Sequence, residues 1–234
     1  YLVTGGDNNV GAGITVNQAL ANGIQSIKNF QCVGGRESGG WNYSSCQGRG
    51  DLSTTQFAIA GLSAASALRP DAAATLPNVV NFVDNAKNGD GGHRYTSGGG
   101  NSSSSTMTAS GVWSYKLAGL ATSDADTQSA MRWLQNNYVY ESVINPSHSN
   151  RGQYYYMWAA AKAFEVTEDD GSGVLFSEEI GGVRNPVSDG YPDETARWYY
   201  DFAWWLTEYQ DGNGSWSRGN AWGDAASRAA MAIL

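Results

Sequence analysis

Three neighbouring side chains that can exchange protons or bind anions follow a glycine pair near the middle of the chain. They are His93, Arg94 and Tyr95, and they come directly after residues 91–92. Histidine titrates near neutral pH, and glycines allow a ligand to approach the backbone closely, so this trio could serve proton transfer or ligand binding. With Asp51 as the carboxylate, these residues are the catalytic candidates that the sequence offers.

A structural interpretation of His93 competes with the catalytic one. Two other glycine-rich loops end in a tryptophan, at Trp41 and Trp216. His93 occupies the matching place in its own loop, so it could simply replace the aromatic residue that fills a joint between helices. The two interpretations differ in one observable, because a catalytic histidine lies in a pocket and a joint residue is packed.

Aromatic residues are abundant, with 9 Trp, 13 Tyr and 6 Phe, and two dense runs occupy residues 154–158 and 198–205. Such rings could line a cavity and stack on sugars or on apolar chains. Because consecutive helix residues point in different directions, at most about half of each run can face one cavity, and the rest belongs to the core. The candidate ligand-binding residues are Trp41, Tyr43, Tyr95, Trp113, Tyr155, Tyr199 and Trp216.

The sequence shows no group of side chains suited to a metal ion or a cofactor. A tetrahedral zinc site needs three or four nitrogen or sulfur ligands, whereas the only histidines, His93 and His148, stand far apart. We therefore expect no metal and no cofactor.

Cys32 and Cys46 are the only cysteines, and thirteen residues separate them across a glycine-rich loop. A disulfide that closes this loop is one interpretation, and it would stabilise the fold by about 3 kcal/mol through the unfolded chain. Two unpaired thiols in a cytosolic protein are the alternative, because compartment decides disulfide formation as much as spacing does. The few lysines and the many Ser, Asn and Gly residues favour the disulfide and a secreted or cell-surface location.

The charge balance excludes two classes of partner. Lys and Arg number 14 against 22 Asp and Glu, which gives a net charge of −8, and no basic run occurs. Nucleic acid is not an expected partner, because phosphate binding needs a concentrated cationic surface. Membrane insertion is not expected either, because the longest apolar stretches, residues 154–161 and 229–234, are much shorter than the ~18 residues of a transmembrane helix.

Eight segments with helical apolar spacing, of two alternating kinds, must position these candidate residues. One kind carries charge and a single apolar stripe, as in Leu20, Ile24 and Ile27, and such helices should lie outside. The other kind is nearly free of charge and apolar all round, as Phe57 and Leu68 illustrate, and such helices should be buried. The first kind comprises the stripes within residues 20–30, 79–86, 130–138 and 202–209, and the second comprises residues 52–68, 106–120, 153–164 and 221–234.

The alternation of outer and inner helices makes the chain a degenerate helix–loop–helix repeat of four pairs. Such pairs, with their turns on a common face, can be wrapped into a ring around the inner helices. The predicted fold is therefore all-α, an α/α toroid of about eight helices that forms an incomplete or small ring, in a single domain of residues 1–234. Residues 166–192 are predicted to form a long loop.

The motif at residues 209–216 contains Gln210, ends in Gly214-Ser215-Trp216 and follows the pair Trp204-Trp205. It resembles the Gln-Trp repeat of the squalene-cyclase and prenyltransferase superfamily. Residues 39–43 with 51–65, and more weakly residues 91–95 with 105–109, resemble the rest of the same unit. The resemblance implies an α/α toroid in which a Gln near the end of an outer helix and a Gly-x-Trp loop tie successive repeats together.

The catalytic signatures of that superfamily are absent from the sequence. There is no Asp-x-Asp-Asp motif of the class II cyclases, no Asp, Cys and His set for the zinc of the prenyltransferases, and no thioester motif. We therefore expect a secreted, non-catalytic module that binds a glycan or an apolar small molecule, or that assembles with copies of itself at the cell surface.

An enzyme is the alternative. His93, Arg94 and Tyr95 are residue types that uronate polysaccharide lyases use, and several of those enzymes are α/α toroids, so an extracellular lyase or hydrolase is one form of it. A divergent terpenoid-processing enzyme is the other. Either form requires these side chains to converge with a carboxylate in a concave pocket.

Overall fold

The structure, a computed structural model of the chain, describes residues 5–9, 11, 13–46, 49–144, 152–218 and 225–233, and of the last stretch it describes the side chains of 228–232. The α-helices are α1 (Val16–Asn29), α2 (Leu52–Ser66), α3 (Pro70–Ala73), α4 (Pro77–Ala86), α5 (Ser105–Leu117), α6 (Ala125–Asn136), α7 (Gln153–Glu165), α8 (Pro186–Asp189), α9 (Trp198–Glu208) and α10 (Ala225–Ile233). Two 3-10 helices are η1 (Gly35–Glu37) and η2 (Ser177–Glu179). Within these ranges only isolated β-bridges occur, so the prediction of an all-α protein is confirmed.

Polar side chains cap the beginning of five of these helices, including α8, where Asn185 accepts from the N–H groups of Val187 and Ser188. The side chains of Thr15, Asp51, Ser104 and Asp124 each accept a hydrogen bond from a backbone N–H in the first turn of α1, α2, α5 and α6, respectively. Such caps satisfy donors that a helix leaves unpaired at its beginning. The places where these helices begin therefore follow from the local sequence.

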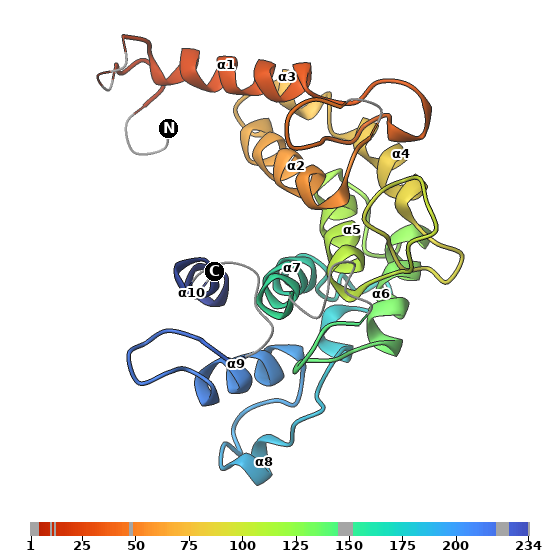
Figure 1. Cartoon of the computed structure of the whole chain (residues 1–234), viewed down its shortest axis with the longest axis vertical. Coiled ribbons are helices and arrows are strands. Elements are labelled where there is room, and N and C mark those ends of the chain that lie inside the picture. Colours follow the sequence, from red (N-terminus) through yellow and green to blue (C-terminus); the bar gives the residue numbers. More distant parts are fainter. Residues whose placement is uncertain are drawn as a thin grey trace.

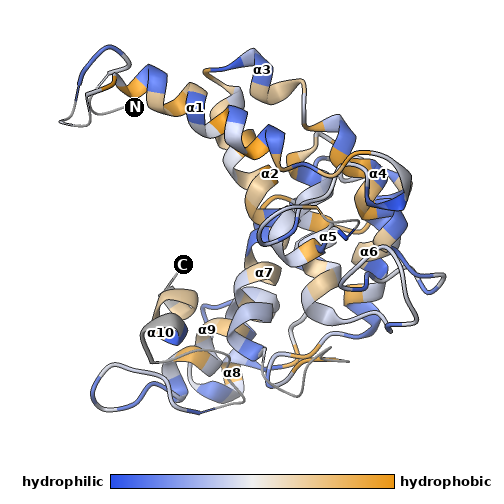
Figure 2. Cartoon of the chain, turned by 45° about the horizontal axis from the view of Figure 1, so that its top comes forward, coloured by the Kyte–Doolittle hydropathy of each residue, from blue (hydrophilic) through white to orange (hydrophobic). Residues whose placement is uncertain are grey.

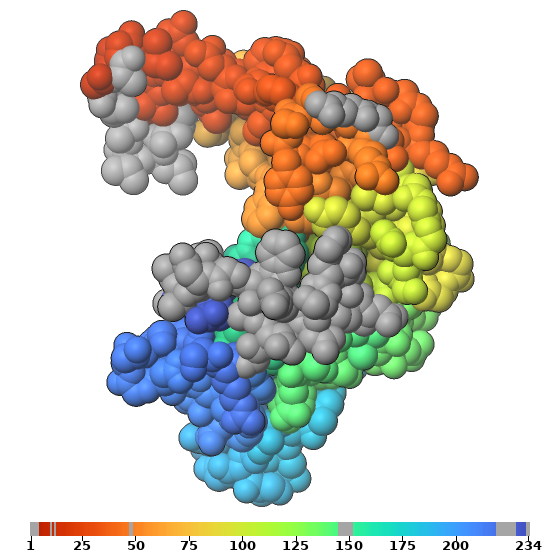
Figure 3. Space-filling view, in the orientation of Figure 1, coloured from red at the N-terminus to blue at the C-terminus, as the bar shows by residue number. Residues whose placement is uncertain are grey.

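The helices follow one another along an open arc (Figure 1). Helices α1 and α2 lie at one end and α9 and α10 at the other, and α2, α7 and α10 border the space between the ends. The space-filling view shows this side hollowed between the N-terminal residues, in red and orange, and the C-terminal residues, in blue (Figure 3). Helix α5 packs against α2 and α7, and α7 packs against α10, so these four charge-poor helices form one continuous inner row.

The outer helices pack against this inner row. Helix α1 contacts α2, α4 contacts α2 and α5, and α6 contacts α5. Helix α9 meets α7 through large rings, with centroids 5.6 Å apart for Tyr154 and Trp205 and 6.0 Å apart for Tyr156 and Phe202. Each of the eight predicted helical segments contains a helix in the structure, and residues 221–224 and 234 of the last segment lie outside the described residues. Helices α3 and α8, of four residues each, were not predicted. Helix α8 and η2 lie within the predicted loop at residues 166–192.

Helix α5 joins two buried apolar clusters. Its Met107 and Tyr115 belong to the cluster of the N-terminal helices, while its Ala109 and Val112 belong to the cluster of the C-terminal helices. Tyr155 of α7 packs against both clusters. The uniform burial of α5 is what a charge-poor helix with apolar residues all round predicts.

Helix α2 departs from the predicted burial of the charge-poor helices. In Figure 2 its ribbon is mainly white and tan, whereas α1 alternates between orange and blue. Yet the Phe57 side chain is 52 % exposed, and that of Leu68, just after α2, is 40 % exposed. The prediction of burial is wrong for these two residues, because α1, α3, α4 and α5 cover the other sides of α2 and leave one side open.

Two successive glycine-rich loops make the same backbone contacts with the inner helix that follows. The N–H of Trp41 donates to the Thr55 hydroxyl at 3.0 Å, and the N–H of His93 donates to the Thr108 hydroxyl at 2.9 Å. Each threonine donates in turn to the carbonyl oxygen of the residue that caps its helix, four positions earlier. Trp41 and His93 are therefore equivalent positions of a structural repeat.

The glycine pairs allow each loop to lie against the next outer helix. Gly39 and Gly91 have φ angles of +96° and +90°, in the region that favours glycine. A Cβ atom on Gly40 would lie 2.6 Å from the Phe82 ring of α4, and a Cβ atom on Gly92 would lie 2.6 Å from Ser103 and 2.7 Å from the Trp133 ring of α6. The pairs therefore fix the spacing between successive repeats.

Cys32 and Cys46 form a disulfide with a Cα–Cα distance of 5.0 Å, as predicted. The bridge closes the loop that carries η1 and Trp41. None of the helices in the described ranges combines the length and the apolar character that crossing a bilayer requires.

Candidate ligand-binding site

Four aromatic rings from three inner helices are in contact and form what we call the aromatic platform: Phe57 of α2, Trp113 of α5, and Tyr155 and Trp158 of α7. The Trp158 ring is central, with centroid distances of 5.1 Å to Phe57, 5.6 Å to Trp113 and 5.9 Å to Tyr155. The Phe57 and Tyr155 rings lie within 23° and 13° of the Trp158 plane. Phe57 is 52 % exposed, Trp113 and Tyr155 are partly exposed, and Trp158 is buried, so the platform offers apolar surface to solvent mainly through Phe57.

Helix periodicity brings the platform and its polar neighbours to the same side. Tyr155 and Trp158 are three residues apart on α7, and Ser53 and Phe57 are four apart on α2, so each pair shares a helix face. Helix α5 packs between α2 and α7 and supplies Trp113 from its C-terminal half. The platform therefore depends on three helices being held in register by the inner row.

Hydroxyl and carboxamide groups lie next to the platform. The Tyr155 hydroxyl accepts a hydrogen bond from Nε2 of Gln56 and donates to Oγ of Ser53 at 3.1 Å. The hydroxyls of Tyr43 and Tyr95 are 3.2 Å apart, within hydrogen-bond distance. Oε1 of Gln56 is buried and has no partner, so one strong acceptor of this group is left unused.

Burial makes Tyr95 and Tyr155 more difficult to ionise than a free tyrosine. It raises the pKa of Tyr155 to about 12. It also raises the pKa of Tyr95 well above its ordinary value, and the hydrogen bond with Tyr43 and the negative charge of Asp51 act in the same direction. The hydroxyls are therefore hydrogen-bond donors and acceptors at this site and not phenolate bases.

Asp51, the carboxylate among the catalytic candidates, lies beside Tyr95 but caps α2. Its Oδ1 accepts from the Thr54 N–H at 2.6 Å and its Oδ2 accepts from the Thr54 hydroxyl at 3.0 Å. Burial raises the pKa of Asp51, while its hydrogen bonds to Thr54 and Tyr95 favour the ionised form. The structure thus brings Asp51 and Tyr95 together, and it gives Asp51 a capping role.

His93 is fully buried and packs in the joint. Its Nε2 is 3.3 Å from the Tyr115 hydroxyl, which donates to Oδ1 of Asp84 at 2.8 Å. Because the hydroxyl proton is used on Asp84, Nε2 carries the imidazole proton, and the buried Nδ1 has no hydrogen-bond partner. Burial lowers the pKa of His93 to about 3, so the ring is neutral at physiological pH. His93 is therefore a packed structural residue between the helices, as its alternative interpretation predicted.

Arg94 points its guanidinium group at acceptors of its own loop and of the last turn of α4. Its terminal nitrogens donate to the carbonyl oxygens of Asn85, Ser97 and Gly99 and to the side chain of Asn88, at 2.9–3.2 Å. His93, Arg94 and Tyr95 therefore do not converge on a common pocket.

Of the predicted ligand-binding residues, Tyr43, Tyr95, Trp113 and Tyr155 lie in or beside the platform. Two further candidates, Trp41 and Trp216, are packed between helices, with exposed fractions of only 3 % and 6 %. Their indole N–H groups donate at 2.7 Å to carbonyl oxygens of Ile27 and Leu206, each two residues before the end of the preceding outer helix. The remaining candidate, Tyr199 on α9, is 53 % exposed, lies beside Trp198 and makes no ring contact with the four platform residues among the contacts of the described residues.

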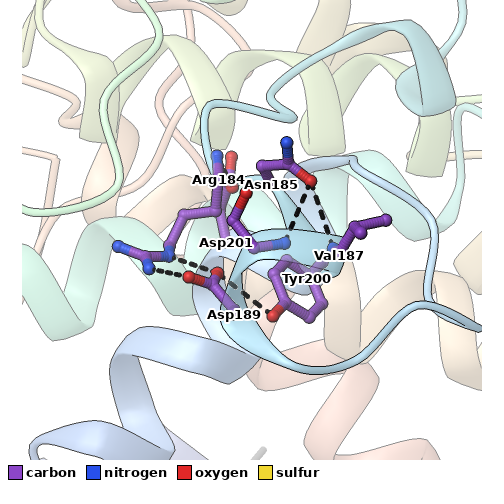
Figure 4. Close-up of polar contacts among 7 residues, drawn as sticks. Arg184, Asn185, Val187, Asp189, Tyr200 and Asp201 are labelled. Carbon is purple, nitrogen blue, oxygen red and sulfur yellow. Dashed lines mark hydrogen bonds and ion pairs between the residues drawn. The ribbon is translucent and has the colours of Figure 1, made fainter.

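A second polar cluster anchors the chain before α9 (Figure 4). Arg184 donates two hydrogen bonds to the Asp189 carboxylate, and the Tyr200 hydroxyl donates to the same carboxylate at 3.2 Å. The buried Asp201 carboxylate accepts the backbone N–H groups of Val183 and Arg184 at 3.1 and 2.9 Å. The Arg184 guanidinium also lies 3.4 Å from the centroid of the Trp204 ring. Every charged group drawn is used internally, so this cluster fastens α8 to α9.

No protein-family model matches the chain. No curated protein and no solved structure matches it either. In the described ranges, no three His, Cys, Asp or Glu side chains gather as a metal site would require.

Four residues of the site were not predicted from the sequence: Ser53, Gln56, Phe57 and Trp158. Phe57 was assigned to the core because α2 is apolar all round. A usable signal existed, since Phe57 shares its helix face with Ala60, Gly61 and Ala64. A single large ring among small residues on one face of an inner helix indicates a surface that is not filled by packing.

Proposed function

We propose that the chain is a non-catalytic module that binds a glycan on the aromatic platform. The platform itself supports this most directly, because the exposed Phe57 ring and the partly exposed Trp113 and Tyr155 rings offer apolar surface next to hydroxyls and the unpaired carboxamide oxygen of Gln56. The apolar face of a sugar ring stacks on such a surface, while its hydroxyls exchange hydrogen bonds with the polar groups at the edge.

The charges near the platform favour a neutral glycan. The charged side chain that raises the pKa of both Tyr95 and Tyr155 is the Asp51 carboxylate, and the whole chain carries a net charge of −8. A uronate would be repelled by this field. A quaternary ammonium group needs a cage of separated rings, whereas these rings contact each other.

The alternative of a lyase or hydrolase has less support. It requires His93, Arg94 and a carboxylate at one accessible surface, and His93 is completely buried while Arg94 holds its own loop. A non-catalytic role needs no such convergence. Self-association, the third possibility, predicts an oligomer in solution.

We further propose that the arc belongs to an α/α toroid of the squalene-cyclase type and that the protein acts outside the cell. The equivalent joints at Trp41 and His93 support repeats of one architecture. The Cys32–Cys46 disulfide supports an oxidising compartment, because such bonds persist there and are rare in the cytosol.

The experiment is a panel of neutral and acidic polysaccharides, screened by thermal shift and followed by calorimetric titration of the hits. A ligand that binds only the folded state raises the melting temperature. Phe57→Ala is the test variant, and Phe30→Ala is its control because Phe30, at the C-terminal end of α1, is similarly exposed, at 49 %. We expect binding to fall by roughly tenfold in Phe57→Ala and to be unchanged in Phe30→Ala.

The proposal is contradicted if no polysaccharide binds, or if both variants bind as the wild type does. Native mass measurement of the same samples addresses self-association. A stable oligomer that Phe57→Ala dissociates would show that the platform binds a second copy and not a glycan.

A further inference from the structure

A cavity of about 360 Å³ lies between α7, α9 and α10, and the proposed glycan site does not account for it. Helix α9 contributes one face of its surface, with Trp198, Phe202 and Leu206 at successive turns. Helix α7 contributes the side that includes Met157 and Trp158. The remaining residues that line the cavity are Ala161, Lys162, Glu165, Tyr199, Ala203, Met231 and Ala232.

The lining is apolar except at one edge. Lys162 and Glu165 carry opposite charges and stand three residues apart on α7, so together they add no net charge to the cavity. Two methionines, Met157 and Met231, contribute flexible side chains that adapt to the shape of a bound molecule. The cavity therefore suits an uncharged apolar molecule.

One lining residue has an unused polar group. Trp198 is 6 % exposed, and its indole N–H is buried without a hydrogen-bond partner. Three other buried tryptophans donate their indole N–H to an oxygen of the protein at 2.7–3.0 Å: Trp41, Trp133 and Trp216. An unpaired buried donor costs about 1–3 kcal/mol, and a ligand acceptor would remove that cost.

We propose that this cavity binds a small apolar molecule that carries one hydrogen-bond acceptor for the Trp198 indole. An apolar cavity of about 150 Å³ holds one benzene ring, so this one has room for roughly twelve to fifteen heavy atoms. Trp198 supplies the single polar contact, and the apolar faces of α7 and α9 supply the rest. The cavity shares the Trp158 ring with the aromatic platform, but Trp198 and Ala203 line the cavity and are not part of the platform. Variants of these α9 residues therefore test the cavity separately from glycan binding.

The test uses two aromatic probes of equal size, 2-methoxynaphthalene, which has an ether oxygen, and 2-ethylnaphthalene, which has no acceptor. Binding to the whole chain is measured by equilibrium dialysis and by the shift in melting temperature. Ala203→Leu adds a larger side chain to the cavity wall. Ala64→Leu makes the same change on the exposed face of α2 and is the matched control.

We expect one molecule of 2-methoxynaphthalene to bind per chain, more tightly than 2-ethylnaphthalene, and Ala203→Leu to weaken this binding by about tenfold or more. The control should bind as the wild type does, and Trp198→Phe should abolish the preference for the ether. If Ala203→Leu does not fold, Ala161→Leu fills the cavity from α7. Failure of both probes to bind the wild type, or equal binding by the filled variant and the control, would overturn the proposal. Equal affinity for the two probes would overturn the role of Trp198.

Discussion

Acid should destabilise this protein through the buried imidazole of His93. The folded-state pKa of His93 is about 3, because burial disfavours the charged ring, and the positive charge of Lys87 acts in the same direction. The carboxylates of Asp126 and Asp90 oppose this effect without overcoming it. In the unfolded chain an imidazole has a pKa of about 6.5.

The sign and the magnitude follow from these two values. Between pH 6.5 and pH 3 the unfolded chain binds a proton that the folded chain does not, so the free energy of unfolding falls as the pH falls. The contribution of His93 is complete above pH 6.5. At pH 5 it should be smaller by about 2 kcal/mol, and the loss should continue towards pH 3. Protonation would also add an N–H at Nδ1, where no acceptor is present.

The assay is urea unfolding at pH 8, 6 and 5, followed by tryptophan fluorescence with the disulfide intact. His93→Gln is the reference variant, because glutamine does not titrate and can still donate to the Tyr115 hydroxyl. Comparing the two proteins removes the effects of groups that both contain. Asp51 and Asp84, whose pKa values burial raises, belong to these groups and act in the opposite sense. The wild type should lose about 2 kcal/mol more than His93→Gln between pH 8 and pH 5. Equal losses, or a His93 ring that titrates near pH 6.5 in the folded protein, would refute the reasoning.

Three further predictions concern the site, the joints and the disulfide. Tyr155→Phe removes the hydroxyl that joins Gln56 and Ser53 and should lower the free energy of unfolding by about 1–2 kcal/mol. Tyr156→Phe removes a buried hydroxyl without a partner and should leave the free energy of unfolding almost unchanged. Equal losses for the two variants in urea titrations would contradict this. Gly92→Ala should cost about 1–3 kcal/mol because its Cβ would meet Ser103 and Trp133, while Gly89→Ala, with open space around it, should be close to neutral by the same measurement. Replacing both Cys32 and Cys46 by Ser should lower the unfolding free energy by about 2–4 kcal/mol, and an unchanged melting temperature would count against a stabilising bridge.

The joints illustrate how far the sequence alone leads. The glycine pair before His93 and the tryptophans in two other loops predicted a joint residue as one of two interpretations. The choice between them needed the Tyr115 and Asp84 side chains, which come from helices α5 and α4. The burial that lowers the pKa of His93 is likewise a property of the assembled helices and not of the loop.

For the binding site, residue type identified candidate rings, but their neighbours could not be inferred from the sequence. Tyr43, Tyr95, Trp113 and Tyr155 were singled out from residue type alone, but nothing in the sequence indicated that their neighbours would be Phe57 and Trp158. Trp41 and Trp216 are of the same residue types and are buried in joints. Residue type identifies rings that could bind a ligand, and packing decides which of them remain accessible.

The sequence by itself determined the positions of eight helices and their alternation between charged and charge-poor segments, and it favoured the pairing of the two cysteines over two free thiols. These are local properties, because capping residues, a period of 3.6 and a short loop act over a few residues. Only the tertiary structure decided that α2 keeps one side open, that the four rings meet around Trp158, and that a cavity remains between α7, α9 and α10. A helical pattern fixes the direction of each side chain on its own helix, whereas its surroundings depend on helices far away along the chain.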